Sequence, residues 1–472
     1  SNEFAMKPET SPRDVHKRVL YMTWVKDRLD LDRVWLLDVD MGAHLWYTDW
    51  FIADIAGLVD VPMAQHDYEK PFVKEYLFEE VRPDFAHAHG SWARTLKISQ
   101  HPEWKEQYVE IPGFPTGRRA LHVGNHVRKD HLVTELPPVS SGKRVRFSDD
   151  VRMETWELRS PVIAPGGELF LDTLWRAKKR DSGLRVLLFL AKGGKVAWSG
   201  EVTPGYDWYK AGRWEPWEYV KGRWSVEIPG SVATGDYQLG LVVLDEKVGV
   251  VLPVVGEGPG GDALWVKDPD SGVEAPAEVP LIENALPPPA IYMTGEWIFP
   301  QSVRIVSVDD AIAEADKVFA SMLEKAKAGN CEAAESAWHD ARHHVAKSKK
   351  WHDEHRETAK AALVGCLLMR MGDTSDNLAK AMLLEEARFI DPRNEALLAA
   401  AGPVGEALHA KGDEFAVNED WDSAFRHYLA AVQADSTRAI SRRKAEDMRD
   451  RRHKIRAYDP KKADDKKGGV LF

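Results

Sequence analysis

The sequence predicts a multidomain protein that combines an α/β domain with a Rossmann-like open sheet, a β-sandwich, and an all-α bundle that resembles helical repeats. Three observations predict this. Buried strand patterns alternate with helical patterns in the first third, short strands separated by Gly and Pro turns follow, and from residue 308 the apolar period is helical. At 472 residues the chain is also too long for one hydrophobic core, and its length suggests about three domains.

Changes in pattern and composition set the expected domain boundaries. Residues 1–5 look like a cloning remnant, and residues 457–472 look like a disordered tail of mixed basic and acidic residues. Between them we expect an α/β domain at 13–145, an immunoglobulin-like or jelly-roll-like β-sandwich at 146–255, a Pro- and Gly-rich connector with at most an edge strand at 256–305, and a tetratricopeptide-like helical domain at 306–456.

Composition narrows the class of protein. A hydrophobic content of 44% and a formal charge of −11 are ordinary for a soluble globular chain and argue against a nucleic-acid partner. The sequence has no run of about 18 apolar residues, and its N-terminus lacks a signal-peptide pattern. Cys331 and Cys366 are too few for a disulfide framework and lack the spacing of a zinc site, so we expect both to be small, buried apolar residues.

Acidic residues follow the first two apolar segments. Residues 34–39 have the pattern of a buried strand that ends in an acidic, glycine-containing turn, and Gly57 and Asp60 close the second segment. In an open α/β sheet, ligands lie at the carboxyl ends of the strands. The candidate ligand-binding residues of this domain are Asp38, Asp40, Asp49, Asp54, Asp60, His87, His89 and Trp92. The aspartates suit a divalent cation, and they also suit helix caps and turn closure, which is the commoner role.

Histidines form a second group in the same domain. His87 and His89 are expected on the same side of one strand. If the strands pair, further histidines are expected near them: His122, His126 and His131. Zinc needs three or four ligands around one point, and no spacing here fixes that geometry. His339 and His343 lie one helical turn apart without a marked third ligand. We therefore favour surface or hydrogen-bonded histidines, and we expect no metal and no other cofactor.

A dense aromatic run crosses the expected sandwich. Exposed indole rings can stack on the apolar faces of sugars, and Asp207, Arg213 and Glu215 lie beside them with groups that can hydrogen-bond sugar hydroxyls. The candidate glycan-stacking residues are Tyr206, Trp208, Trp214 and Trp217. The alternative is that these aromatics fill the sandwich core or brace a long loop, and we expect that role for about half of the run.

Three short motifs in the α/β domain carry a resemblance to a known family. They are an Asp-x-Asp turn followed by Gly and Tyr, the segment Asp-x-x-Gly-Leu-x-Asp-x-x-x-Ala, and Arg-Pro-Asp before a strand. The matching residues are Asp38, Asp40, Gly42, Tyr47, Asp54, Gly57, Leu58, Asp60, Ala64, Arg82, Pro83 and Asp84. This pattern resembles the soluble region that follows the membrane helices in bacterial glycosyltransferases of the dolichyl-phosphate-mannose mannosyltransferase type and in related arabinofuranosyltransferases. The resemblance implies that the catalytic carboxylates belong to a membrane part that this sequence does not contain.

Two further segments resemble known modules. In the expected sandwich, residues 165–176 and 228–239 are similar to the sandwich domain often appended to the same envelope glycosyltransferases. In the helical region, small residues and aromatics have the spacing of a tetratricopeptide-type pair. That pair consists of Gly412, Trp421, Ala424, Tyr428, Ala431 and Ala439.

These features predict a soluble, periplasmic or otherwise extracytoplasmic accessory region of a bacterial membrane glycosyltransferase-like protein. We expect it to be natively anchored by an upstream membrane segment and not to be catalytic by itself. Its expected partners are a glycan or polyprenyl-linked sugar and a protein bound by the helical repeats. Two alternatives stay open: a non-enzymatic protein-interaction scaffold of the cell envelope, and a metal-dependent hydrolase that uses Asp38 with Asp40 and His87 with His89.

Overall fold

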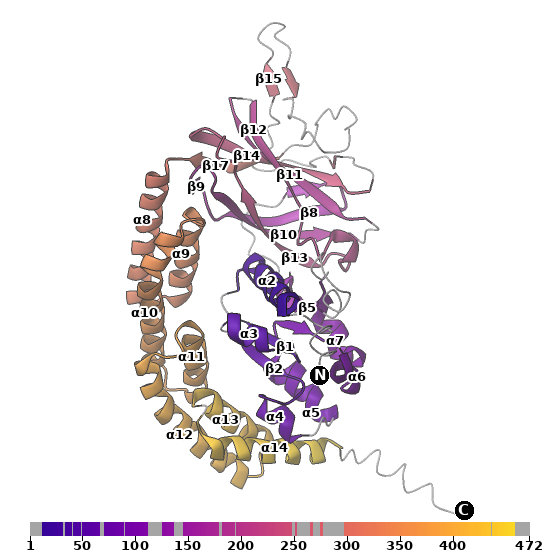
Figure 1. Ribbon diagram of the computed structural model, residues 1–472, viewed down its shortest axis with the longest axis vertical. Coiled ribbons are helices and arrows are strands. Elements are labelled where there is room, and N and C mark those ends of the chain that lie inside the picture. Colours follow the sequence, from indigo (N-terminus) through magenta and orange to yellow (C-terminus); the bar gives the residue numbers. More distant parts are fainter. Residues whose placement is uncertain are drawn as a thin grey trace, which may run out of the picture. The chain divides into compact units, whose positions relative to one another are not determined.

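The structure is a computed structural model (Figure 1). It describes residues 12–31, 34–39, 41–48, 50–66, 70–88, 90–111, 125–135, 145–178, 182–193, 195–247, 251–252, 265–267, 274–276, 297–435 and 437–457. The chain forms two compact units, Ser1–Ala311 with His343–Lys347, and Ile312–Arg342 with Ser348–Phe472. The first unit contains three mixed or mostly antiparallel five-stranded sheets, and the second is helical. The coarse expectation of mixed α/β structure followed by helices is therefore confirmed.

The first sheet, sheet A, is mixed and has the strand order β2-β1-β3-β5-β4. Its strands are β1 (Trp35–Asp38), β2 (Phe51–Asp54), β3 (Phe85–His87), β4 (Tyr108–Glu110) and β5 (Asn125–Arg128). Strand β1 pairs in parallel with β2 on one side and β3 on the other, whereas β5 runs antiparallel to both β3 and β4. The parallel pairing that a Rossmann-like open sheet requires is thus limited to the first three strands, with β1 between β2 and β3.

Short helices connect the strands of sheet A, and the long helix α2 (Pro12–Leu29) precedes them. The short helices are α3 (Gly42–Tyr47), α4 (Val61–Gln65), α5 (Lys70–Glu75), η1 (Tyr76–Val81), α6 (Gly90–Thr95), η2 (Ile98–Gln100) and α7 (Pro102–Gln107). A further short helix, η4 (Lys129–His131), follows β5 and leads to sheet B. Side chains alternate along β1, so Leu36 packs with Met22 and Val25 of α2 in one hydrophobic cluster. Leu37 packs with Phe72 in another cluster. Sheet A is therefore covered by apolar groups on both faces.

Two further sheets follow in the first unit. Sheet B has the order β6-β13-β10-β8-β7, and sheet C has the order β12-β11-β14-β17-β9. The strands of sheet B are β6 (Val133–Thr134), β7 (Val145–Phe147), β8 (Val151–Leu158), β10 (Glu168–Ala177) and β13 (Tyr219–Glu227). Those of sheet C are β9 (Val162–Ile163), β11 (Leu184–Lys192), β12 (Lys195–Val202), β14 (Gly235–Asp245) and β17 (Trp297–Ile305). Leu171 and Trp175 of sheet B share one hydrophobic cluster with Leu188 and Leu241 of sheet C, so the two sheets bury a common core.

The expected connector at 256–305 requires a correction. Strand β17 is nine residues long and pairs with β14 on one side and β9 on the other, so it is an interior strand and not an edge strand. Two short strands, β15 (Trp265–Lys267) and β16 (Glu274–Pro276), pair with each other in the same region. A stretch that looks like a linker locally can join a sheet because its partners, β14 and β9, are supplied from distant parts of the chain.

The second unit consists of successive helices. They are α8 (Val308–Lys327), α9 (Cys331–His344), α10 (Lys349–Asp373), α11 (Asn377–Ile390), α12 (Glu395–Val417), α13 (Trp421–Ala434) and α14 (Ala439–Ala457). Asp376, Asn394 and Asp420 cap the starts of α11, α12 and α13 by accepting hydrogen bonds from backbone N–H groups. Gly412 of α12 packs against the ring of Tyr428 so closely that an added Cβ would lie 2.7 Å from it. Among the described helices, none combines the length and apolar character needed to cross a membrane.

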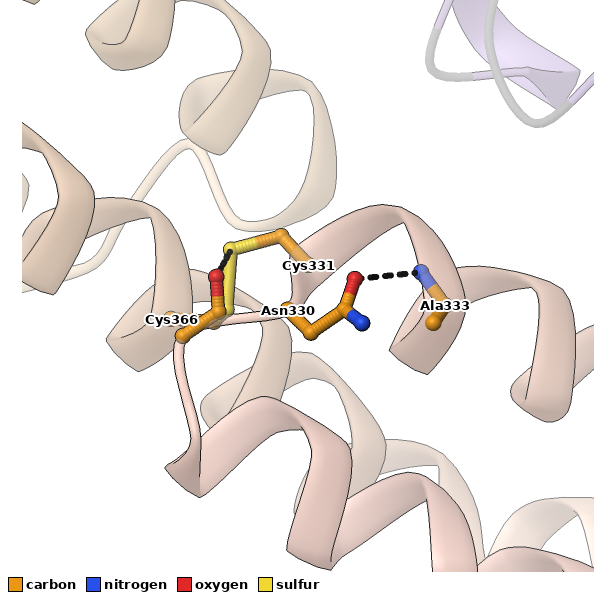
Figure 2. The surroundings of a disulfide bond; sticks show 5 residues. Asn330, Cys331, Ala333 and Cys366 are labelled. Atoms are coloured by element: carbon orange, nitrogen blue, oxygen red, sulfur yellow. Dashed lines mark hydrogen bonds between the residues drawn. A yellow bond between two sulfur atoms is a disulfide. The ribbon is translucent and has the colours of Figure 1, made fainter.

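The two cysteines are buried, as expected, but they form a disulfide bond with each other, so the expectation that they are simply small apolar residues needs correction. Cys331 is the first residue of α9, and Cys366 lies within α10, with 5.7 Å between their Cα atoms. Figure 2 shows this bond beside Asn330, whose side-chain oxygen accepts a hydrogen bond from the N–H of Ala333. The count of two cysteines is compatible with one bridge, but their proximity depends on the packing of α9 against α10, which no local pattern reveals.

We predict that the disulfide stabilises the helical unit. Closing a loop of this length is expected to contribute about 2–4 kcal/mol, mainly by restricting the unfolded chain. The double variant Cys331→Ser/Cys366→Ser should therefore unfold at a lower urea concentration than the wild-type protein. Adding a reductant should lower the midpoint of the wild-type protein and leave that of the variant unchanged. Detection of two free thiols in denatured, unreduced protein isolated from an oxidising compartment would contradict the assignment.

Candidate functional site

The carboxyl ends of the parallel strands bring Asp38 and Asp54 side by side, because these residues are opposite each other in the register of β1 and β2. Asp38 is completely buried and forms an ion pair with Arg18 of α2 at 3.2 Å. Its other oxygen accepts a hydrogen bond from the backbone N–H of Val39. A buried carboxylate paired in this way is a structural ion pair, since removing either partner would leave an uncompensated charge.

Asp54 and Asp60 have the structural roles that the sequence left as an alternative. Asp54 accepts backbone hydrogen bonds from Ala56, Leu58 and Val59 at 2.6–3.0 Å and thereby closes the turn after β2. Asp60 caps α4 and also accepts a hydrogen bond from the hydroxyl of Tyr76. Burial raises the pKa of Asp60 to about 6. These contacts are the turn-closing and capping roles that the sequence analysis gave as the commoner alternative, and ligand binding by the two residues stays a prediction.

The histidines of the domain are also engaged by neighbours. His87 is completely buried, and its Nδ1 lies 2.7 Å from the side-chain oxygen of Asn125 on β5. His131 pairs with Asp84 at 2.8 Å. In the part of the chain that the structure describes, no three His, Cys, Asp or Glu side chains are grouped as metal ligands. Trp92 lies on α6 and is 37% exposed. Four of the residues named from the sequence lie outside the described part of the chain: Asp40, Asp49, His89 and His122.

His44 of α3 was not identified from the sequence, although it lies beside Asp38. It is completely buried, its ring stacks on Trp50, and its Nε2 is 3.8 Å from the Asp38 carboxylate. Within the described residues, neither ring nitrogen has a hydrogen-bond partner. Burial lowers the pKa of His44 to about 4, although Asp38 acts in the opposite direction. The imidazole is therefore neutral at neutral pH.

The expectation of exposed, glycan-stacking rings is wrong for Tyr206, Trp208 and Trp214. They are 3%, 2% and 4% exposed and belong to the hydrophobic core of the first unit. Tyr206 stacks on Trp208, which in turn contacts Trp24 of α2. The indole N–H of Trp214 donates a hydrogen bond to the backbone oxygen of Tyr209. These aromatics brace the segment between β12 and β13, which is the alternative stated for them.

Trp217 differs from the other three candidates because it is only half-buried. Its backbone has φ +63°, in the left-handed region that a tryptophan rarely adopts. Arg152 and Arg176 both approach its ring, with guanidinium carbons 4.8 and 5.7 Å from the ring centroid. Trp217 is thus the single predicted stacking residue that the structure leaves accessible.

A polar concavity of about 620 Å³ lies over the outward face of sheet B, and we call it the sheet-B cleft. The C-terminal end of α2, including Leu29, Asp30 and Leu31, forms its rim. Its floor consists of two cross-strand rows, as the register of β8, β10 and β13 shows. The first row is Glu157, Asp172 and Arg223, and the second is Thr155, Leu174 and Lys221.

Arg223 organises the first row of the sheet-B cleft. Its guanidinium group lies 2.6 Å from an Asp172 carboxylate oxygen and 2.6 Å from the Asp30 carboxylate, so it links sheet B to the end of α2. The same group also donates a long hydrogen bond to the backbone oxygen of Leu29. Asp30 has φ +53°, a backbone conformation that aspartate tolerates better than most residues. Charge-assisted hydrogen bonds therefore hold the rim of the cleft, at the end of α2, against its floor on sheet B.

The second row contributes a partly desolvated amine and an apolar side chain. Lys221 donates a hydrogen bond to the backbone oxygen of Asp130, and burial lowers its pKa. Leu174 lies between Lys221 and Thr155 in the register and is 8% exposed, so the middle of the cleft floor is apolar and mostly covered by its neighbours. With Asp30, Asp172 and Glu157 opposing Arg223 and Lys221, charges of both signs line the cleft and nearly cancel. Such a lining can donate and accept hydrogen bonds without strongly selecting an ion of either sign.

The sequence did not identify the sheet-B cleft, although a weak signal was present. Asp172 lies between buried neighbours along β10, and Lys221 and Arg223 do so along β13. This alternation predicts which residues face outward, but the strand register and the position of α2 decide that they share one concavity.

Comparison of the sequence with models of known protein families gives no match, and comparison with curated proteins gives none either.

Because Trp214 is buried, we predict that Trp214→Ala destabilises the first unit as a whole. Truncating a buried tryptophan typically costs about 3–5 kcal/mol, so the urea midpoint should fall markedly. Trp217→Ala, at a half-buried position, should cost less. Urea unfolding followed by circular dichroism tests both variants, and an unchanged midpoint for Trp214→Ala would argue that its ring is exposed.

His44 and Asp60 predict opposite pH dependences of stability. Since the pKa of His44 falls from 6.5 to about 4 on folding, the unfolded chain binds the proton first, and the free energy of unfolding decreases as pH falls through this range. The pKa of Asp60 rises from 3.8 to about 6, so the folded chain binds its proton first and is stabilised on acidification. From about pH 7 to about pH 5 these effects amount to roughly 2 and 1 kcal/mol.

Two variants separate these contributions. In His44→Phe, which keeps an aromatic ring against Trp50, the change in the free energy of unfolding from about pH 7 to about pH 5 should be roughly 2 kcal/mol more favourable than in the wild-type protein, so that the stabilisation from Asp60 remains. In Asp60→Asn the loss should become steeper. Urea unfolding at the two pH values gives both differences, and parallel pH profiles for the wild-type protein and His44→Phe would contradict the assignment of a neutral, buried imidazole.

Proposed function

We propose that this chain is an extracytoplasmic binding region that positions a glycan or lipid-linked sugar in the sheet-B cleft and does not itself catalyse a reaction. In this proposal it belongs to a membrane glycosyltransferase-like protein, and its helical unit binds a partner protein. The observation that carries the proposal is the composition of the cleft: acidic, basic and hydroxyl groups surround an apolar patch, with little net charge. A polyhydroxylated, neutral ligand matches this surface, because each hydroxyl both donates and accepts a hydrogen bond.

The dimensions and apolar groups of the cleft support the same ligand class. Its volume of about 620 Å³ lies within the usual range for small-molecule sites, roughly 300–1,000 Å³. Leu31, together with the small exposed parts of Leu29 and Leu174, can contact the apolar C–H face of a sugar, while Glu157 and Thr155 can bind its hydroxyls. In this arrangement the ligand lies across sheet B, and not on the aromatic run proposed from the sequence.

The fold and the disulfide support the proposed domain types and the proposed extracytoplasmic location. We propose that sheets B and C form an immunoglobulin-like or jelly-roll-like sandwich, since they bury a common core and consist mostly of antiparallel strands. The close packing of Gly412 on Tyr428 supports a tetratricopeptide-like character of the helical unit. The Cys331–Cys366 bond supports an extracytoplasmic location, because disulfides persist in oxidising compartments and are rare in the cytosol.

A second candidate function is a protein-interaction scaffold of the cell envelope. It is favoured by large apolar side chains exposed on helices of the second unit, where a partner could cover them. These residues are Met382 (70% exposed), Leu398 (58%), Val417 (82%) and Ile440 (59%). The metal-dependent hydrolase has less support, because Asp38 is engaged by Arg18 and His87 by Asn125.

We predict that the wild-type protein binds neutral oligosaccharides on a glycan array and that Glu157→Ala weakens this binding about tenfold, because a carboxylate–hydroxyl hydrogen bond is lost. Glu201→Ala is the matched control, since Glu201 is an exposed glutamate on β12 of sheet C, outside the cleft. Calorimetric titration with the best array ligand gives the affinities. Absence of binding to every saccharide, or equal losses in the two variants, would reject the proposal, and specific capture of a protein partner would favour the scaffold instead.

A further inference from the structure

The outward face of sheet B continues beyond the sheet-B cleft into a row of three arginines. Arg146 of β7 is directly opposite Arg152 of β8, and Arg152 is directly opposite Arg176 of β10. Residues that are opposite each other in adjacent strands point to the same face of the sheet. Like charges in such positions repel one another and destabilise a sheet, so a row of three is an arrangement that folding alone does not favour.

The row lies directly beside the cleft. Along β10, Arg176 occupies the next outward position after Leu174, and along β13, Tyr219 occupies the next outward position after Lys221. One such step along a strand is roughly 7 Å. A ligand in the cleft can therefore reach the arginine row with a neighbouring substituent or a neighbouring sugar unit.

Carboxylates balance two of the three arginines. Arg176 lies 3.6 Å from the buried Glu154, and Arg146 lies 3.0 Å from the exposed Asp149. Arg152 has no ion pair with any carboxylate among the described residues, and its Nε is buried without a hydrogen-bond partner there. The row therefore carries one positive charge in excess, located on Arg152.

Trp217 holds the guanidinium group of Arg152 without consuming its N–H donors. The Arg152 guanidinium carbon is 4.8 Å from the centroid of the indole ring, which is a cation–π contact and not a hydrogen bond to a polar atom. The strained backbone of Trp217 is fixed by its N–H donating to Ala177 and by its carbonyl accepting from Arg176. Strain of this kind persists where the surrounding structure imposes it, and it often marks a functional position.

We propose that Arg152, oriented by Trp217 and flanked by Arg176, is an anion subsite that extends the sheet-B cleft, so that the ligand is an acidic saccharide. This proposal rests on the glycan-binding function proposed above and specifies its ligand class. A planar guanidinium group binds a carboxylate or a phosphate oxygen pair in a bidentate manner, which is the chemistry shared by uronic acids and sugar phosphates. The neutral part of the saccharide occupies the cleft, and its acidic group binds Arg152.

The test compares pairs of saccharides in which one member has an acidic group and the other does not. We would titrate the full-length protein with trigalacturonate and its neutral methyl ester, with glucose 6-phosphate and glucose, and with inorganic phosphate alone. The acidic member of at least one pair should bind about tenfold more tightly than its neutral partner, and this preference should weaken as the salt concentration rises. The pair with the larger preference identifies a carboxylate or a phosphate as the natural group.

Variants of Arg152 test whether this residue causes the preference for acidic saccharides. Arg152→Gln should abolish the difference between acidic and neutral saccharides while leaving the affinity for the neutral member within about twofold, and Arg152→Lys should restore only part of it because it lacks the planar fork. Arg185→Gln is the matched control, since Arg185 is an exposed arginine on β11 of sheet C that pairs with Glu201. Thermal unfolding verifies that each variant is folded.

The outcomes separate the two proposals. Equal affinity for acidic and neutral members of both pairs would overturn the anion subsite and leave the glycan-binding function standing. An acidic preference that survives in Arg152→Gln would also overturn it, because the preference would then arise elsewhere. Phosphate binding without any saccharide binding, or no binding at all, would reject the glycan-binding function and with it the subsite.

Discussion

The first unit depends on the guanidinium group of Arg223, which joins two parts of the chain that are nearly two hundred residues apart. It binds Asp172 within sheet B and Asp30 with the Leu29 carbonyl at the end of α2. These groups are only about a quarter exposed or less, so solvent screens them less than a typical surface pair. Because α2 packs its apolar side on sheet A, Arg223 joins sheet A to sheet B at the rim of the sheet-B cleft, together with the Lys129–Glu218 ion pair at 2.6 Å and the bond from Lys221 to the Asp130 carbonyl.

Local patterns were sufficient to predict the element types but not their assembly. Residues such as Phe170 and Asp172 alternate with buried neighbours, so strand β10 could be predicted from its own sequence. The place of β17 between β14 and β9 could not, because strand order is decided by partners far away in the chain. The same reason explains the disulfide, whose two cysteines are 35 positions apart and meet only through helix packing.

The candidate site shows where local reasoning succeeds and where it fails. Asp54 and Asp60 engage backbone groups within five residues of themselves, and the sequence offered that capping role as the alternative. The burial of Trp208, in contrast, depends on Trp24 of α2, more than 180 positions earlier, and no local pattern reveals such a contact. A dense aromatic run is therefore ambiguous until its long-range neighbours are known, whereas an acidic residue before a helix is not.

The bridge between Cys331 and Cys366 also has a mechanical consequence. If a pulling force acts along the chain, tension passes through the sulfur–sulfur bond and bypasses the residues between the two cysteines. That segment cannot be extended while the bond is intact, and fully stretched it would otherwise add about 120 Å of contour length. Under load, most of α9 and the greater part of α10 would remain a closed loop while the helices that follow could still be drawn out.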